Sequence, residues 1–160
     1  MKIRPALPTD AQAIKSAHYH AYQHNYKGYL PDEFLKNMPF DKATIARTAE
    51  QIKNGEYYVA LLANQVIGFA VLSYPEKQIV EIMALYVHPT FQKKGAGRAL
   101  MNEICRLKKR IGYKKLVLWT IENGPSLGFY EKQGMIRSSD APNKKFWKCD
   151  IPIIRLEKDL

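Results

Sequence analysis

The 160-residue chain contains little cysteine and no long apolar run, and both shortages exclude classes of protein. Its two cysteines, Cys105 and Cys149, form no CxxC pair, so they cannot make a zinc site by themselves. We expect both to be buried free thiols in a reducing compartment. No apolar stretch approaches the roughly 18 residues that a membrane span requires, so we expect no membrane partner. The first ten residues lack the apolar segment of a secretory signal, which predicts a cytoplasmic protein.

Acidic residues are also scarce relative to basic ones. The chain has 25 Lys and Arg against 15 Asp and Glu, a formal net charge of +10. Such an excess suits an anionic partner, and nucleic acid, an anionic membrane and a phosphorylated cofactor all fit. Much of it falls within residues 93–115, where the charged face of a helix is the alternative explanation. Charge alone does not choose between them.

What the chain does contain is typical of a globular protein, with 46% apolar and 25% charged residues. Because no repeat, low-complexity tract or linker divides it, we expect a single domain over residues 1–160. Alternating apolar patterns predict strands at 2–4, 57–62, 66–74, 79–87, 115–121 and within 151–156. Helical patterns begin at Thr9 or Asp10, at Pro31 and at Asp41, and cover 96–111 and 125–133. The order β-α-α-β-β-β-α-β-α-β predicts an α/β (α+β) protein with a mixed sheet and helices on both faces.

The segment HPTFQKKGAGRAL, residues 88–100, places two lysines and two glycines where the strongest helix begins. Free backbone N–H groups at a helix N-terminus bind anions, and Gly95 and Gly97 would let a phosphate approach the backbone. A Walker A loop is excluded because no Gly-Lys-Ser/Thr follows the glycines. A Rossmann fingerprint is disfavoured, since Leu100 occupies the third glycine position and residues 88–94 separate the strand from the first glycine.

Two blocks resemble the GNAT superfamily of acyl-CoA-dependent N-acetyltransferases. LYVHPTFQKKGAGRALM is similar to the family's acyl-CoA loop, in which a strand ending in Leu-x-Val-x-Pro precedes Arg/Gln-x-x-Gly-x-Gly/Ala. ENGPSLGFYEKQGM resembles the family's Asn-x-x-Ala/Ser-x-x-Phe-Tyr-Glu-Lys-x-Gly-Phe, although Gly128 and Met135 depart from it. The resemblance implies a mostly antiparallel sheet with a V-shaped splay between two central parallel strands, which end at Val87 and Ile121. It also implies acetyl-CoA as co-substrate, direct acetyl transfer and no metal.

The resemblance places coenzyme A in this splay. Pantetheine would pair with the backbone of Leu85, Tyr86 and Val87, while Asn123 and Tyr130 would approach the thioester end, and Ser126 is a further cofactor-binding candidate. Asn123 is also a candidate N-cap of the following helix. The diphosphate would bind the loop and the first helical turn, which consist of Gln92, Lys93, Lys94, Gly95, Ala96, Gly97 and Arg98.

Two side chains are candidates for proton transfer. By strand alternation, Glu81 shares a face with Met83, Leu85 and Val87, and burial among apolar groups raises the pKa of a carboxylic acid toward that of a useful base. The resemblance also implies a general base at Glu81, whereas a solvent-facing position near the start of the strand is the alternative. It assigns Tyr130 the role of protonating the departing thiolate, for which a phenol of pKa about 10 suits a thiol of pKa about 8.5. An ordinary packing tyrosine is the alternative there.

The acceptor side is defined least well by the sequence. The resemblance makes Tyr26 and Tyr29 pocket-lining residues, and the acceptor a primary amine on a small molecule or a peptide. His20 and His24 have helical i, i+4 spacing, but Ala21 stands in place of the HExxH glutamate, so no metal site is expected.

Two other functions remain open at this point. One is a catalytically silent sensor that binds acyl-CoA. The other is a basic nucleic-acid-binding domain, which is disfavoured because the chain has no reader motif. A homodimer is compatible with either reading.

Overall fold

A computed structural model describes residues 1–146 and 149–160. Its centre is an eight-stranded sheet of order β1-β2-β3-β4-β5-β8-β6, with β7 paired to β8. The strands are β1 (Lys2–Pro5), β2 (Glu56–Leu62), β3 (Gln65–Glu76), β4 (Ile79–Val87), β5 (Lys115–Ile121), β6 (Ile136–Arg137), β7 (Lys144–Lys145) and β8 (Pro152–Asp159). All neighbouring strands are antiparallel except β4 and β5, which confirms the mixed, mostly antiparallel sheet.

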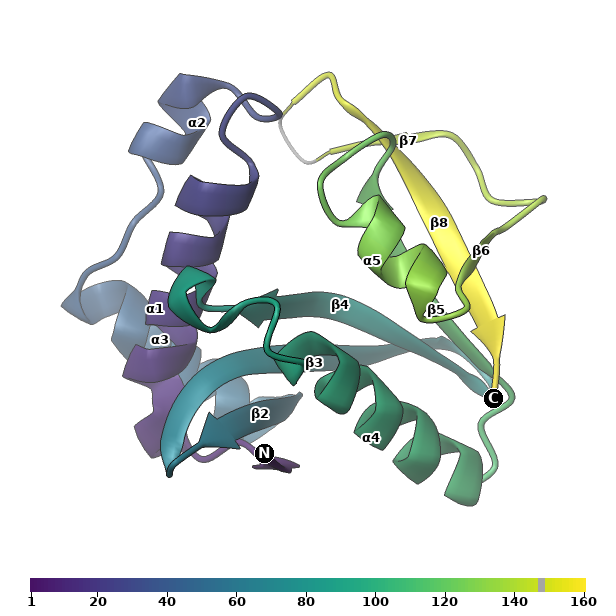
Figure 1. Ribbon diagram of the computed structural model, residues 1–160, viewed down its shortest axis with the longest axis horizontal. Helices are drawn as coiled ribbons and strands as arrows, with labels where there is room; N and C mark the ends of the chain where they lie inside the picture. The colour runs from purple at the N-terminus through teal and green to yellow at the C-terminus, as the bar shows by residue number, and fades with distance from the viewer. Residues whose placement is uncertain (147–148) are drawn as a thin grey trace.

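Helices cover both faces of this sheet (Figure 1). The helices are α1 (Ala11–Asn25), α2 (Asp32–Lys36), α3 (Lys42–Asn54), α4 (Ala96–Arg110) and α5 (Leu127–Lys132). On one face, α1 and α3 bury Val59 and Phe69. On the other, α4 packs through Leu100 and Ile104, which are fully buried because their i, i+4 spacing puts both on the helix side that meets the sheet. No helix in the described part of the chain has the length and apolar character needed to cross a membrane.

The two parallel strands separate along their length. Pairing between β4 and β5 runs from Ile79 with Lys115 to Ile82 with Leu118, and stops there. Figure 1 shows the strands together near the C-terminus and diverging away from it. Their C-terminal halves therefore leave backbone groups of β4 without a strand neighbour on that side, and the predicted V-shaped splay is confirmed.

A β-bulge lies at the point where the splay opens. Met83 has no partner on β3, because Val71 pairs with Ala84 while Leu72 pairs with Ile82. A bulge inserts one residue into a strand and bends it, and here it leaves the Met83 side chain 63% exposed. The bulge thus coincides with the departure of β4 from β5.

The bulge at Met83 also reverses the alternation of side chains along β4. After it, Leu85 packs in the cluster under α4, and Tyr86 packs in the cluster under α1. Before it, Glu81 lies on the face of Tyr86, because the extra residue shifts the period by one. The prediction that Glu81 shares a face with Met83, Leu85 and Val87 is therefore wrong.

The remaining differences from prediction concern element ends and short strands. Helix α5 begins at Leu127 rather than residue 125, because Asn123 has a left-handed φ of 58° and the Gly124 N–H closes a tight turn onto the Ile121 carbonyl (2.9 Å). Asn123 is therefore not the N-cap. The two-residue strands β6 and β7 carry no periodic signal and were not predicted. Both cysteines are free, but they are half-buried rather than buried.

Candidate active site

A cavity of about 490 Å³ opens between the end of β4, the start of α4 and α5. This volume falls within the range typical of ligand sites. Its wall brings together most residues predicted to bind the cofactor, and one predicted to be catalytic: Leu85, Tyr86, Val87, Gln92, Lys93, Gly95, Ala96, Gly97, Arg98, Ser126 and Tyr130. Lys94, Asn123, Glu81, Tyr26 and Tyr29 are not part of this wall.

The loop before α4 is held by the side chain of Gln92. Its amide nitrogen donates to the Val87 carbonyl (3.0 Å) and to Asn25 Oδ1 (3.2 Å), while its backbone N–H donates to the Pro89 carbonyl (3.1 Å). Gln92 therefore fixes the loop to β4 and to the end of α1. Asn25 also lines the cavity and was missed, since nothing in the sequence links two residues this far apart.

The backbone from Lys93 to Arg98 forms a cradle of donors. Lys93 and Gly95 have left-handed φ angles of 60° and 88°, which turn the chain into α4 with Gly95 as its N-cap. Among the described residues, the N–H groups of 93–98 have no hydrogen-bond acceptor. Free amides at the positive end of a helix dipole favour an anion. Lys94 points elsewhere, with its ammonium 5.4 Å from the centre of the Phe91 ring.

Gly97 has a second role that sequence reasoning did not identify. A Cβ at this position would lie 3.0 Å from Cζ of Phe129 on α5, closer than side chains normally tolerate. Gly97 thus lets α5 approach α4 across the cavity, in addition to keeping the backbone open.

Four tyrosines lie close together beside the cavity, and Tyr86 and Tyr130 are the two that line its wall. The Tyr86 hydroxyl donates to the Tyr22 hydroxyl (3.2 Å), and Tyr26 and Tyr130 are both 8% exposed. Burial raises the pKa of Tyr130 well above the usual value for a phenol, and the neighbouring Tyr26 raises it further. Burial also raises the pKa of Tyr26, although hydrogen bonding to Tyr86 and Ser126 partly opposes it. These phenols therefore stay protonated at neutral pH, and each can donate a hydrogen bond as well as accept one.

The other predicted site residues lie outside this arrangement. Glu81 is half-buried, and its carboxylate accepts a hydrogen bond from Ser73 Oγ (3.1 Å). Tyr29 is 46% exposed and Asn123 is exposed. Tyr26 is buried against Leu30, Leu35 and Ile121, so only its hydroxyl end is near the cavity residues.

Comparison with known proteins identifies the class of protein to which this fold and cavity belong, an acetyltransferase that uses acetyl-CoA. Residues 15–135 match the Acetyltransferase (GNAT) family, and the chain belongs to that family. It is 26% identical over 133 residues to the N-acetyltransferase YuaI of Bacillus subtilis (strain 168), covering 81% of this chain and 76% of that protein. It is 27% identical over 141 residues to a probable N-acetyltransferase of Mycobacterium tuberculosis, covering 83% of this chain and 78% of that protein.

Solved structures agree with the fold. PaiA N-acetyltransferase from Thermoplasma acidophilum, in complex with coenzyme A, superimposes with a TM-score of 0.79 at 18% identity, over 99% of this chain and 98% of that chain. A GCN5-related N-acetyltransferase from Rhodopseudomonas palustris has a TM-score of 0.81 at 20% identity, over 99% and 95%. The resemblance drawn from the two sequence blocks is therefore confirmed.

Proposed function

We propose that this acetyltransferase moves the acetyl group of acetyl-CoA directly to a primary amine of a small molecule or a peptide. The observation that supports it most strongly is the cavity in the splay, whose wall combines the loop that carries six backbone amides without an acceptor among the described residues and the Tyr130 phenol. This distribution matches a long cofactor with an anionic end and a reactive thioester end.

The proposed binding mode uses groups that the fold leaves without partners. The diphosphate would accept from the amides of residues 93–98, with Lys93 and Arg98 adding positive charge. Pantetheine would take the place beside β4 that β5 vacates, pairing with the backbone of Leu85–Val87. Ser126 lines the same wall, whereas Lys94 and Asn123 lie outside it, so we leave these two out of the proposed contacts.

The proposed chemistry needs one base and one acid. The amine nitrogen attacks the thioester carbonyl carbon, and Glu81 takes the amine proton, directly or through a water molecule. The C–S bond then breaks, and the Tyr130 hydroxyl gives its proton to the leaving sulfur. Solvent returns a proton to Tyr130, and the proton held by Glu81 leaves to solvent, so the protein ends unchanged. Because Glu81 lies on the α1 face of β4, the amine would approach from the side of Tyr26 rather than from α4.

Binding and turnover of acetyl-CoA test the proposal. We expect acetyl-CoA to raise the melting temperature, and a panel of amines, amino acids and peptides to contain acceptors that release free thiol. Lys93→Ala should weaken acetyl-CoA binding, whereas Lys109→Ala, on the last turn of α4, removes the same charge outside the cavity and serves as control. No shift with acetyl-CoA would contradict the proposal. A shift without thiol release from any acceptor would favour the acyl-CoA-binding sensor instead.

Replacing Glu81 with glutamine tests the base. The amide keeps the size of the side chain but cannot take a proton, so we expect kcat/KM to fall about 10²-fold at neutral pH. The acidic limb of the pH–rate profile, which a general base produces, should disappear as well. Glu131→Gln on α5 is the matched control, because Glu131 is exposed and does not line the cavity. An unchanged rate and profile in Glu81→Gln would exclude this role.

A further inference from the structure

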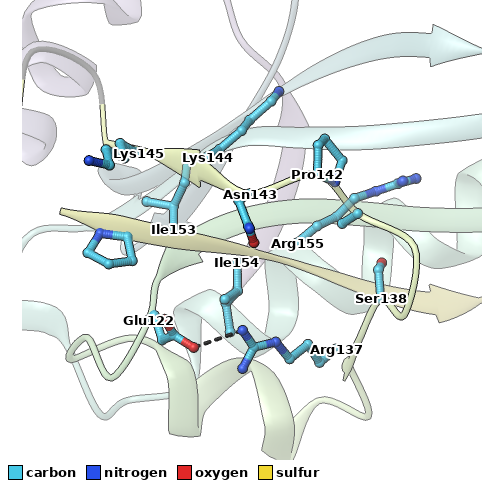
Figure 2. A pocket seen from close by; sticks show the side chains of 12 residues that line it. Glu122, Arg137, Ser138, Pro142, Asn143, Lys144, Lys145, Ile153, Ile154 and Arg155 are labelled. Carbon is cyan, nitrogen blue, oxygen red and sulfur yellow. Dashed lines mark ion pairs between the residues drawn. The ribbon is translucent and has the colours of Figure 1, made fainter. Parts of the chain in front are cut away.

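A second cavity, of about 260 Å³, lies at the outer edge of β8. Two short strands pair with this edge, β7 beside Pro152 and Ile153 and β6 beside Leu156 and Glu157. The loop of residues 138–143 spans the gap between them and is tied down by the Ser138 N–H, which donates to the Arg155 carbonyl (3.0 Å). Figure 2 shows the side chains that surround the resulting hollow.

The charged side chains of this pocket are mostly cationic. Four of its lining residues are basic, namely Arg137, Lys144, Lys145 and Arg155, and Glu122 is the acidic one among the described residues. Glu122 is already engaged, since its Oε1 lies 2.8 Å from the Arg137 guanidinium (Figure 2). Lys145 forms an ion pair with Asp150.

The other two cations, Lys144 and Arg155, form no ion pair with any residue that the structure describes. Both are neighbours of Trp119, Lys144 through its side chain and Arg155 through strand pairing. The Lys144 ammonium lies 4.3 Å from the centre of its ring, and Arg155 is its cross-strand partner on β8. The charge of Arg155 also reaches Glu157, but that carboxylate is held by Lys115 at 2.7 Å. Both residues line the pocket, and two cations without a carboxylate partner among the described residues favour the binding of an anion there.

The pocket adjoins the proposed acceptor side of the active site. The Glu122 N–H, directly after β5, donates to the Pro152 carbonyl (3.0 Å), and Ile153 packs against Tyr26 and Ile121. Neighbouring strands lie about 5 Å apart, so the outer edge of β8 is on the order of 10 Å from the arm of the splay that β5 forms.

We infer that this pocket binds an anionic group, a carboxylate or a phosphate, that belongs to the acceptor. The inference rests on the proposed function and specifies its substrate class: an acceptor that carries an acidic group in addition to the amine that is acetylated. Lys144 and Arg155 position the acceptor and take no part in proton transfer. A polycationic acceptor is disfavoured, because its second positive charge would be repelled by Lys144 and Arg155.

Direct binding of small anions tests the pocket without any need for turnover. The chain has two tryptophans, so a Trp147→Phe background leaves Trp119 as the fluorescent reporter. We expect glutarate and inorganic phosphate to change its emission saturably, and neutral glutaramide to leave it unchanged. Arg155→Ala and Lys144→Ala should each weaken anion binding about 10- to 100-fold, the effect of losing a charged hydrogen bond. Arg155→Lys keeps the positive charge and should therefore bind the anion more tightly than Arg155→Ala. Lys109→Ala should have no effect.

Peptide pairs that differ only in Glu against Gln test whether the anion is the acceptor's. The acidic member should displace glutarate and show the lower KM as an acceptor, and Arg155→Ala should raise that KM while leaving the neutral member unchanged. Absence of saturable anion binding, equal binding by the alanine variants, or equal behaviour of the two peptides would each overturn the inference. Acetyl-CoA binding is measured separately, so the two outcomes can be distinguished. Binding of acetyl-CoA without a preference for the acidic peptide would contradict only this inference, whereas absence of acetyl-CoA binding would contradict the proposed function.

Discussion

Tyr130→Phe should lower kcat about 10²- to 10³-fold while leaving the KM for acetyl-CoA within about twofold of wild type, as expected for loss of a general acid. The substitution removes only the hydroxyl, so the ring keeps its packing in the core beneath α5. Because burial raises the pKa of Tyr130 well above the ordinary phenol value, its proton is present at every pH from 6 to 9. The rate loss should therefore be the same across that range, and Tyr130 should contribute no alkaline limb to the profile.

The measurement is steady-state thiol release at saturating acetyl-CoA, with the fold of the variant checked by its melting temperature. Tyr57→Phe is the matched control, because Tyr57 is a half-buried phenol in the cluster under α1 and α3, away from the cavity. Full kcat in a folded Tyr130→Phe protein would remove the acid role. It would leave Tyr130 as a packing residue.

Glu56→Ala should destabilise the protein by about 3 kcal/mol, at the lower end of the range for breaking a buried ion pair. Lys108 on α4 is 4% exposed, and its ammonium lies 2.6 Å from Glu56 Oε1 and 5.2 Å from the centre of the Tyr74 ring. The Tyr58 hydroxyl donates to the same carboxylate (2.7 Å), as does that of Tyr74. Without Glu56, a buried cation and two phenols lose their common partner.

The loss should appear as a lower urea midpoint with an unchanged slope. Glu50→Ala, which breaks the exposed pair with Lys53, is the control and should cost less than about 1 kcal/mol. Adding Lys108→Met to Glu56→Ala should recover part of the stability, because an apolar side chain can stay buried without a partner. A Glu56→Ala protein as stable as wild type would show that Lys108 reaches water.

The same pair sets an acid dependence of stability. Burial raises the pKa of Glu56, but the hydrogen bonds from Lys108, Tyr74 and Tyr58, together with the Lys108 charge, outweigh it and lower the pKa below its usual value. A lowered carboxyl pKa contributes stability above the unfolded pKa of about 4.3, and this contribution is lost as the pH falls through the folded value. Wild type should therefore lose stability below about pH 4 more steeply than Glu56→Ala.

The glycine loop was predictable in position and in backbone conformation because its signals are local. Gly95 is needed where φ is left-handed, and the long apolar stripe that begins at Ala96 forces a helix to start there. The free amides at the beginning of α4 follow from that helix start, whereas those of Lys93 and Lys94 belong to the preceding turn. The role of Gly97 beside Phe129 was not predictable, since it depends on how two helices approach each other.

The strand face on which Glu81 lies could not be predicted from the sequence. A strand alternates side chains only while its register is unbroken, and nothing local marks Met83 as an inserted residue. The bulge exists because β4 must pair with β3 throughout while leaving β5 halfway along. The face on which Glu81 lies is thus decided by three strands together.

By itself, the sequence determined the order of the main elements and the position of the glycine loop, because both rest on neighbouring residues and their periodicity, and two blocks that resemble the family indicated the family. Only the tertiary structure decided which face Glu81 takes, that Gln92 bonds to Asn25, and that Lys144 and Arg155 are both neighbours of Trp119. Those contacts join residues far apart along the chain, and strand register and packing, rather than local propensity, bring them together.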